Sequence, residues 1–206
     1  MIIGITGFKG SGKDTVGNYL EKNNFIKYSF AEPLKDITSI IFDWPRELLE
    51  GNTPESRYWR EQVDTFWEEK LNIKNFTPRY ALQYVGTEII RKNLYNDIWL
   101  SLCEKKILNN KNRDIVVTDC RFKNELQLIE KYNGKIIHIK NNTEPFWYDT
   151  ALKANMNDLE AISYLNYLNI HKSEYDFIGY PSDYVIINNS TLEKLYEQID
   201  EIIFDL

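Results

Sequence analysis

The sequence predicts a three-layer α/β fold in which a mainly parallel five-stranded sheet is flanked by helices. Two observations predict it. Short runs rich in β-branched residues alternate along the chain with longer segments whose apolar residues recur at helical spacing. The first of these runs ends at a glycine-rich turn that leads directly into a helical segment, as in a strand–loop–helix unit.

Five segments are predicted to form the strands. Residues 1–6 are a short β-branched run that ends at glycine, which is typical of a buried strand. Residues 114–119 are an apolar run that ends in a carboxylate. The predicted strands are 1–6, 25–30, 114–119, 134–140 and 183–189.

Helices are predicted between the strands. Behind Lys13, the residues Val16, Tyr19 and Leu20 fall at i, i+3 and i+4 and share one helix face. The other predicted helical segments are 31–42, 55–71, 77–94, 96–108, 121–132, 158–168 and 191–203.

The segment 77–94 has a clear helix start, since Thr77 suits the N-cap and Pro78 suits the first helical position. Three apolar residues are expected on one side of this helix, namely Leu82, Val85 and Ile89. Three polar residues spaced by four are expected on the opposite side, namely Gln83, Thr87 and Arg91.

Residues 141–181 differ from the rest of the chain. They carry polar turns, Pro145 and Pro181, and a helix-like middle at 158–168. We expect this segment to be an insertion between two strands of the sheet.

Composition limits the classes of function. The 206 residues fit one domain or one core with insertions, and the formal net charge is −6. A protein whose main function is to bind a nucleic-acid backbone is more often basic. Because this chain is acidic, we expect no nucleic-acid partner. No apolar run approaches the ~20 residues of a membrane span, so we expect no membrane partner.

The cysteines indicate the compartment. Cys103 and Cys120 form no CxxC pair and follow no secretory signal, so we expect reduced thiols and a cytoplasmic protein. Two histidines and two unpaired cysteines do not favour a structural zinc site.

The turn after the first strand has the frame of a phosphate-binding loop. Gly7 and Gly12 bracket four residues, and Lys13 follows. Glycines let backbone N–H groups approach phosphate oxygens, the next helix presents its N-terminus, and the lysine reaches the β and γ oxygens. We expect this loop to bind a nucleoside triphosphate. The residues expected at the phosphates are Gly7, Lys9, Gly10, Ser11, Gly12, Lys13, Asp14 and Thr15.

Asp14 stands where this frame normally has Ser or Thr, and Thr15 comes one place late. Asp14 could ligate Mg²⁺, directly or through a water, because Mg²⁺ favours oxygen ligands. Alternatively, it only complements the helix dipole while Thr15 faces the phosphates. Asp119, at the end of a strand, is the expected second carboxylate for Mg²⁺, with a plain strand-terminal turn as the alternative.

Six motifs occur in a fixed order along the chain, namely "GKDT" (12–15), "AEPLK" (31–35), "LQYVGTEIIR" (82–91), "DIW" (97–99), "TDCRFKNE" (118–125) and "HKSE" (171–174). Together they resemble the phage- and virus-type deoxynucleoside monophosphate kinases of the P-loop kinase superfamily. The resemblance implies a single P-loop kinase domain over 1–206, with an acceptor-binding region at 31–110 and a lid at 141–181. It also implies transfer of the γ-phosphoryl of ATP to a small-molecule substrate, a deoxynucleoside monophosphate (dNMP), with Mg²⁺ as cofactor. If the chain is viral, its place is the host cytoplasm.

The resemblance also assigns acceptor residues. Lys35 would approach the monophosphate, and Gln83 and Arg91 would contact the acceptor nucleotide. Gly86 would let that nucleotide approach the backbone closely, and Trp99 would line the acceptor site or stack there. From the residues alone, Lys35 and Arg91 could instead face solvent, and Trp99 could be plain core.

The remaining implied roles belong to catalysis and the lid. Lys13 and Arg121 would be catalytic, and Arg121 would also bind phosphate. Glu125 would lie on the same helix face as Arg121. His171 and Glu174 would bring the lid over the nucleotides. Arg121 and Glu125 could instead be only a surface ion pair, and His171 only a surface residue.

In one respect the sequence departs from the family. All seven arginines lie at or before Arg121, whereas lids of monophosphate kinases usually contribute arginines. The basic residues of the predicted lid are only Lys153 and Lys172. The positive charge that neutralises the transferring phosphate is therefore expected from one of these lysines or from an arginine elsewhere in the chain. The arginines considered for that role are Arg57, Arg60 and Arg79.

Two other functions stay open at this point. One is a P-loop kinase of another small phosphorylated metabolite, because phosphomevalonate-type kinases also carry "SGKD" (residues 11–14 here). The other is a non-catalytic or nucleic-acid-directed P-loop module, which the acidic balance disfavours. A homodimer is what the family suggests, with the aromatic-rich segment 43–77 as its candidate contact.

Overall fold

The computed structural model describes residues 1–141 and 143–206, so Asn142 of the predicted lid lies outside the described residues. The chain forms two compact units. The first comprises 1–29 and 103–206, and the second comprises 30–102. Among the described residues, no helix is long and apolar enough to cross a membrane.

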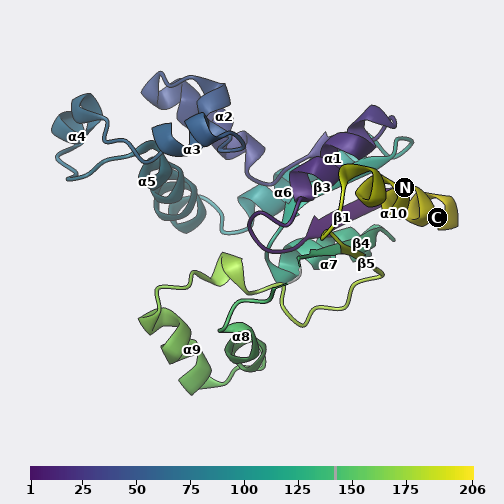
Figure 1. Cartoon of the computed structure of the whole chain (residues 1–206). Coiled ribbons are helices and arrows are strands. Elements are labelled where there is room, and N and C mark those ends of the chain that lie inside the picture. Colours follow the sequence, from purple (N-terminus) through teal and green to yellow (C-terminus); the bar gives the residue numbers. More distant parts are fainter. Residues whose placement is uncertain (142) are drawn as a thin grey trace. The chain divides into compact units, whose positions relative to one another are not determined.

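The first unit is built on the predicted sheet (Figure 1). The strand order is β2-β3-β1-β4-β5, and all four pairings are parallel. The strands are β1 (Ile2–Thr6), β2 (Ile26–Tyr28), β3 (Ile115–Cys120), β4 (Lys135–Lys140) and β5 (Tyr184–Ile187). The prediction of five strands in a mainly parallel sheet is confirmed.

Helices cover both faces of this sheet. On one face, α1 (Lys13–Lys22) and α10 (Leu192–Asp205) pack against Ile3, Ile5 and Ile137 in a fully apolar core. On the other face, α7 (Lys123–Lys131) comes so close that a Cβ on Gly4 would lie 2.7 Å from the Ile129 side chain.

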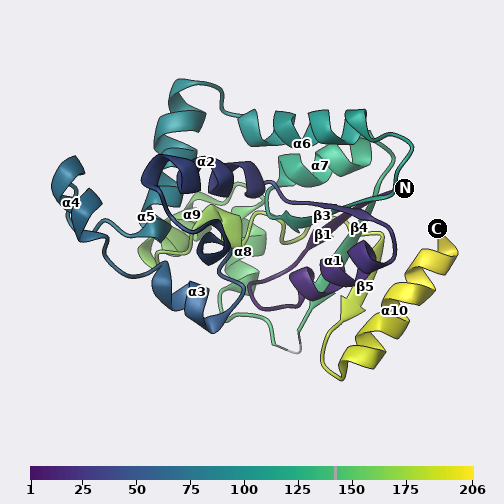
Figure 2. The ribbon, with the colours of Figure 1, turned by 90° about the horizontal axis from the view of Figure 1, so that it is seen from above.

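The helix α6 (Ile98–Asn109) crosses from the second unit into the first. Its C-terminal part runs beside α7 (Figure 2), where Glu104 pairs with Lys131 at 2.6 Å. The first unit therefore has the predicted three layers of helix, sheet and helix.

The outer edge of β5 is closed at one residue. The Gln198 side chain on α10 accepts from the backbone N–H of Ile187 at 3.1 Å and donates to its carbonyl oxygen at 3.2 Å. Both outward backbone groups of Ile187 are thereby satisfied within the chain.

The segment between β4 and β5 contains more helix than the sequence indicated. The predicted helix at 158–168 is confirmed as α9 (Leu159–Tyr167), whose N-cap Asp158 accepts from two backbone N–H groups. In addition, α8 (Tyr148–Ala154) and the 3-10 helix η3 (Lys172–Glu174) lie within it.

The second unit is helical. It contains α2 (Glu32–Phe42), the 3-10 helix η1 (Arg46–Leu49), α3 (Pro54–Trp59), α4 (Thr65–Leu71), α5 (Pro78–Gln83) and the π-helix η2 (Tyr84–Arg91). The single helix predicted over 55–71 is two helices, because Asp64 ends the turn after α3 and caps α4 by accepting from the N–H of Trp67.

The core of the second unit is aromatic. Trp44 and Phe76 are buried in it, and Trp59 and Trp67 pack against it. The indole N–H of Trp44 donates to Asp64, and that of Trp67 donates to the carbonyl of Phe42. Tyr58 and Phe66 of the same segment are 70% and 59% exposed, so a homodimer contact at 43–77 stays a prediction.

The helix predicted over 77–94 has an unexpected winding. Thr77 caps it as predicted, but from Tyr84 it continues as a π-helix. In a π-helix the hydrogen bonds run from i to i+5, so side chains five apart share a face. Val85 and Ile90 consequently pack against the core, while Ile89, predicted on the buried side, is 47% exposed.

Candidate active site

The phosphate loop follows β1 and leads into α1. Gly7, Gly10 and Gly12 have φ angles of 145°, 80° and 103°, which side-chain-bearing residues rarely adopt. A Cβ on Gly7 would lie 2.3 Å from the carbonyl oxygen of Ile139. Around Gly10 nothing lies within 4 Å of such a Cβ, so the loop is open there.

The N-terminus of α1 is available to an anion. Its N-cap is Gly12, which offers no side-chain acceptor to the first helical N–H groups. Uncapped N–H groups and the partial positive charge of the helix end favour a phosphate at this position. Ser11, just before it, is fully buried, and its hydroxyl finds no hydrogen-bond partner among the described residues. The loop therefore has the free donors that a triphosphate needs, and it fits one.

Lys13 folds back over its own loop. Its Nζ donates to the carbonyl oxygens of Gly7 and Phe8, each at 2.7 Å, and the residue is 9% exposed. Burial, and after it the positive charge of Arg121, lower the pKa of Lys13 to about 8, although Asp14, Glu174 and Asp119 act in the opposite direction. The ammonium group thus lies among these four charged side chains.

Two carboxylates in the first unit suit the expected Mg²⁺. Asp14 lies in the first turn of α1 with an exposed side chain, and Asp119 in β3 accepts from the Ser29 hydroxyl at 2.7 Å. Within 1–141 and 143–206, no three His, Cys, Asp or Glu side chains form a metal-binding group. The chemistry of Asp14 and Asp119 fits Mg²⁺, which commonly takes one or two carboxylates together with phosphate oxygens and waters.

Arg121 lies between the end of β3 and the start of α7. Its guanidinium pairs with Glu174 at 3.3 Å, and both side chains are half-exposed. Glu125 has a different position, because it is buried at the start of α7. Its carboxylate accepts from the backbone N–H groups of Arg121 at 2.8 Å and Phe122 at 3.0 Å. Glu125 therefore orders the turn that carries Arg121.

The predicted lid residues lie around η3. The imidazole Nδ1 of His171 hydrogen-bonds the Ser173 hydroxyl at 2.8 Å and accepts from its N–H at 3.2 Å, so His171 caps η3. Lys172 pairs with the buried Asp176 at 3.5 Å. Asp176 also accepts from the backbone N–H of Lys123 at 2.8 Å, which ties the insertion to α7.

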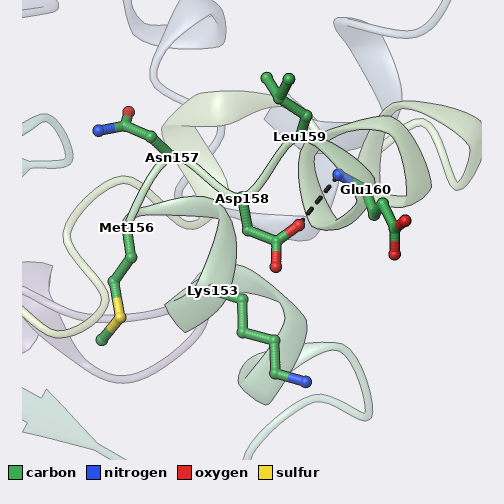
Figure 3. A pocket seen from close by; sticks show the side chains of 6 residues that line it. All are labelled: Lys153, Met156, Asn157, Asp158, Leu159 and Glu160. Atoms are coloured by element: carbon green, nitrogen blue, oxygen red, sulfur yellow. Dashed lines mark hydrogen bonds between the residues drawn. The ribbon is translucent and has the colours of Figure 1, made fainter.

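Lys153, the other lysine of the predicted lid, lines a separate hollow. A hollow of about 570 Å³ lies at the turn between α8 and α9 (Figure 3). It is lined by Lys153, Met156, Asn157, Asp158, Leu159 and Glu160. None of these lining residues belongs to the phosphate loop.

In the second unit, Lys35 belongs to a charged cluster. Its Nζ pairs with Glu50 at 2.6 Å, and Glu50 also pairs with Arg46, which reaches Asp36 at 2.5 Å. Lys35 is therefore partly buried and paired rather than solvated. These contacts hold its ammonium group close to η1.

The other predicted acceptor residues lie along η2 and the start of α6. Gly86 is buried, and a Cβ there would lie 2.7 Å from the Leu34 side chain, so a glycine is needed for the packing of α2. Trp99 is 4% exposed and donates from its indole to the carbonyl of Gly86 at 3.3 Å. Gln83 is exposed and Arg91 half-buried. The structure thus brings Gly86 and Trp99 together.

A sequence model of the deoxynucleotide monophosphate kinases matches residues 1–75 and 53–152. The chain belongs to this family. A deoxynucleotide monophosphate kinase homologue of Acanthamoeba polyphaga mimivirus is 30% identical over 212 residues, which cover 97% of this chain and 94% of that protein. The deoxynucleoside-5′-monophosphate kinase of Escherichia phage T5 is 29% identical over 182 residues, which cover 65% of this chain and 73% of its own. The predicted family is confirmed.

Among solved structures, dephospho-CoA kinase from Campylobacter jejuni aligns with 99% of this chain and 96% of its own. The sequence identity is 15% and the TM-score 0.47, a likeness too low to support a conclusion.

The family match covers the phosphate loop, the predicted acceptor residues and Arg121, whereas His171 and Glu174 lie beyond it. Two further residues at the loop were missed by sequence reasoning. Asn188 donates from its amide to the carbonyl oxygen of Ser11 at 2.9 Å, and Phe8 packs against the insertion. Asn188 directly follows β5, and residues at the carboxyl ends of parallel strands gather at one edge of a sheet, so that rule could have indicated it.

Proposed function

We propose that this deoxynucleotide monophosphate kinase family member transfers the γ-phosphoryl group of ATP to a deoxynucleoside 5′-monophosphate, giving ADP and a deoxynucleoside diphosphate. The observation that carries the proposal is the phosphate loop, which this chain has as a member of the family. The loop combines an uncapped helix start, a buried Ser11 hydroxyl without a hydrogen-bond partner among the described residues, and a Lys13 ammonium group held over the loop. Family membership does not favour the alternative of a phosphomevalonate-type kinase.

The acceptor is already anionic, because a monophosphate carries between one and two negative charges near neutral pH. A general base is therefore unnecessary, and the protein has to align two phosphates and neutralise their charge. Asp14 and Asp119 would hold Mg²⁺, which would supply positive charge that offsets the charge of the phosphates.

Lys13 and Arg121 would supply the positive charge. The two carbonyl oxygens that now accept from Lys13 are neutral, so a phosphate is the stronger acceptor for its ammonium group. Among the described residues, the Arg121 guanidinium pairs with Glu174 in a half-exposed contact, which a phosphate can replace at little cost. Both groups can therefore move to the transferring phosphoryl group without disrupting the sheet.

Exclusion of water would be the task of the insertion between β4 and β5. Its anchors are the contacts of Asp176 with the N-terminus of α7 and of Glu174 with Arg121. Because the insertion contacts Arg121 through Glu174, it can close over bound nucleotides and limit hydrolysis of ATP.

We also propose that the protein works in the cytoplasm of a host cell. Both curated relatives named above come from viruses, and Cys103 and Cys120 are buried free thiols. A homodimer stays a prediction, which sedimentation of the purified chain can test.

The deciding experiment is turnover with ATP and Mg²⁺ against each of the four dNMPs and their ribonucleotide counterparts, with phosphomevalonate as a comparison acceptor. We expect formation of a deoxynucleoside diphosphate from at least one dNMP. ATP binding without phosphorylation of any nucleoside monophosphate would contradict the proposal.

A further inference from the structure

Phe8 is connected to Lys13 through its backbone. Its carbonyl oxygen accepts two hydrogen bonds, one from Lys13 Nζ at 2.7 Å and one from the N–H of Ser11 at 3.1 Å. The turn of the loop and the ammonium group thus meet at one oxygen atom. The placement of the Phe8 peptide group therefore helps to set the placement of Lys13.

The ring of Phe8 is held by the insertion between β4 and β5. Its centroid lies 5.8 Å from Trp147, 6.3 Å from Tyr148 and 5.3 Å from Phe177, with interplanar angles of 79°, 64° and 67°. These are edge-to-face arrangements, which aromatic pairs favour. We call these four side chains the Phe8 cluster. Trp147 is the N-cap of α8 and Tyr148 its first residue, so the cluster joins α8 to the loop.

The far side of the cluster is fixed to the sheet. Phe177 stands edge-on to His138 in β4, with centroids 5.7 Å apart and an angle of 89°. Burial lowers the pKa of His138 to about 4, so its ring is neutral and adds no charge near Lys13. Asp176, next to Phe177, is held by the N–H of Lys123. The ring of Phe8 therefore meets a supported surface.

From this arrangement we infer that Phe8 is a positioning residue that couples nucleotide binding at the phosphate loop to the packing of α8. The inference rests on the proposed function, in that ATP is the ligand of the loop. A triphosphate that attracts the Lys13 ammonium removes one of the two donors from the Phe8 carbonyl. The peptide group then readjusts, and the ring shifts against Trp147, Tyr148 and Phe177.

Coupling of this kind is reciprocal. If ATP shifts the packing equilibrium of α8, the packed and loosened states differ in ATP affinity by the same factor, so a change that loosens the cluster from the side of α8 must alter ATP affinity. The loop and the insertion can therefore be perturbed separately, which distinguishes coupling from simple local packing.

The test compares Phe8→Ala with Phe146→Ala. Phe146 is a matched control, because it lies beside Trp147 but is 82% exposed and outside the Phe8 cluster. Two quantities are measured on the full chain with Mg²⁺: ATP affinity by calorimetry, and backbone hydrogen exchange of α8 with and without ATP. In the unmodified chain and in Phe146→Ala, we expect ATP to change the exchange rate of α8. In Phe8→Ala, we expect that change to vanish and ATP to bind roughly tenfold more weakly.

A merely structural Phe8 would give a different pattern. Exchange of α8 would rise in Phe8→Ala without nucleotide, but the ATP-dependent change would persist, and that result would overturn the inference. An α8 segment that does not respond to ATP in the unmodified chain would overturn it as well. If Phe8→Ala does not fold, Trp147→Leu probes the cluster from the other side with the loop sequence intact. An unchanged ATP affinity in that variant would also reject the coupling.

These measurements involve no acceptor nucleotide. Failure to phosphorylate any dNMP would therefore reject the proposed function while leaving the response of α8 to ATP interpretable.

Discussion

The side-chain amide of Asn188 donates to the carbonyl oxygen of Ser11 at 2.9 Å, across a separation of 177 residues. A Cβ on Gly12 would lie 2.4 Å from the same amide nitrogen, so Asn188 is packed directly against the phosphate loop. The backbone N–H of Asn188 donates to the carbonyl of Lys140 at 2.9 Å, which fixes this contact to β4. The last strand of the sheet thereby holds the loop that follows the first.

Replacing Asn188 by Asp should therefore weaken ATP binding. The carboxylate cannot donate to the Ser11 carbonyl, and it adds a negative charge beside a site for phosphates. Loss of one hydrogen bond costs about 0.5–1.5 kcal/mol, and we expect at least a severalfold rise in the Kd for ATP, measured by calorimetry. Asn166→Asp, at an exposed position of α9, is the matched control. Equal ATP affinity in the two variants would show that the contact does not support the loop.

Replacing Lys13 by Ala should lower kcat about 10²–10³-fold, the usual effect of losing a preorganised donor to a charge that develops in the transition state. The variant should still fold, because the Phe8 carbonyl keeps its hydrogen bond from the N–H of Ser11. Steady-state kinetics and circular dichroism check these two expectations. Lys22→Ala, in the last turn of α1, should retain normal turnover. Near-normal turnover in Lys13→Ala would mean that the loop lysine does not act on the transferring group.

ATP binding should depend on pH through Lys13. Burial and then the charge of Arg121 lower its pKa to about 8, so the free protein loses this positive charge as the pH rises through that value. A bound triphosphate favours the charged form, and binding near pH 8 should therefore take up a proton. Calorimetry in two buffers with different ionisation enthalpies measures the uptake. Lys13→Arg, which stays charged, should bind ATP without this pH step, and a step retained in that variant would assign it to another group.

Lys13 should also make the stability of the fold depend on pH. Loss of its charge at high pH should weaken ATP binding, whereas stability should rise with pH. The folded pKa of Lys13 lies below the unfolded value of 10.5, so between about pH 8 and 10.5 the unfolded chain binds more protons than the folded chain. The contribution of Lys13 to the free energy of unfolding should therefore rise with pH over this window. Denaturant unfolding of the unmodified chain and of Lys13→Met, compared at both ends of the window, isolates that contribution. A constant difference between the two proteins would contradict the lowered pKa.

Arg121 and Glu125, four residues apart, should separate into a functional and a structural residue. Arg121→Ala should lower kcat at least tenfold and change unfolding by no more than about 1 kcal/mol, because its contact with Glu174 is half-exposed. Glu125→Ala removes a buried carboxylate that accepts from two backbone N–H groups, and we expect a loss of about 2–3 kcal/mol in the free energy of unfolding. Kinetics and urea unfolding of both variants give the comparison. A stable, fully folded Glu125→Ala with impaired acceptor binding would instead favour direct contact of Glu125 with substrate.

Gly86→Ala should destabilise the second unit, since the added methyl group would lie 2.7 Å from the Leu34 side chain. Overpacking of this kind costs about 1–3 kcal/mol. Leu34→Val should recover part of the loss in the double variant by making room, and unfolding of the two single variants and the double variant measures this. If the effects of the two single variants simply add in the double variant, contact with Leu34 is not the reason that position 86 requires glycine.

The strands and the phosphate loop could be predicted because their signals are local. A β-branched run that ends at Gly7, followed by Gly12 and Lys13, already contains the geometry that the structure shows. The π-helix could not be predicted, because its five-residue register depends on packing. Only contact with the aromatic core of the second unit selects Ile90 rather than Ile89.

The parts of the site that escaped prediction are contacts between distant residues. Nothing near Phe8 in the sequence indicates that Trp147 and Phe177 surround its ring. The role of Glu125 was also ambiguous, since helix spacing places it beside Arg121 but does not tell a surface pair from a buried acceptor. Burial, which decides such cases, is a property of the packed chain.

The contacts of Gln198 with Ile187 have a consequence for self-association. An open outermost strand can recruit a strand of a second molecule, which is a common route to fibrils and to dimers built by sheet extension. At Ile187 both hydrogen-bonding positions are filled by one glutamine, so a foreign strand would first have to displace it. Loss of that amide, as in Gln198→Leu, would leave Ile187 with two unpaired groups facing outward and a ready template for aggregation.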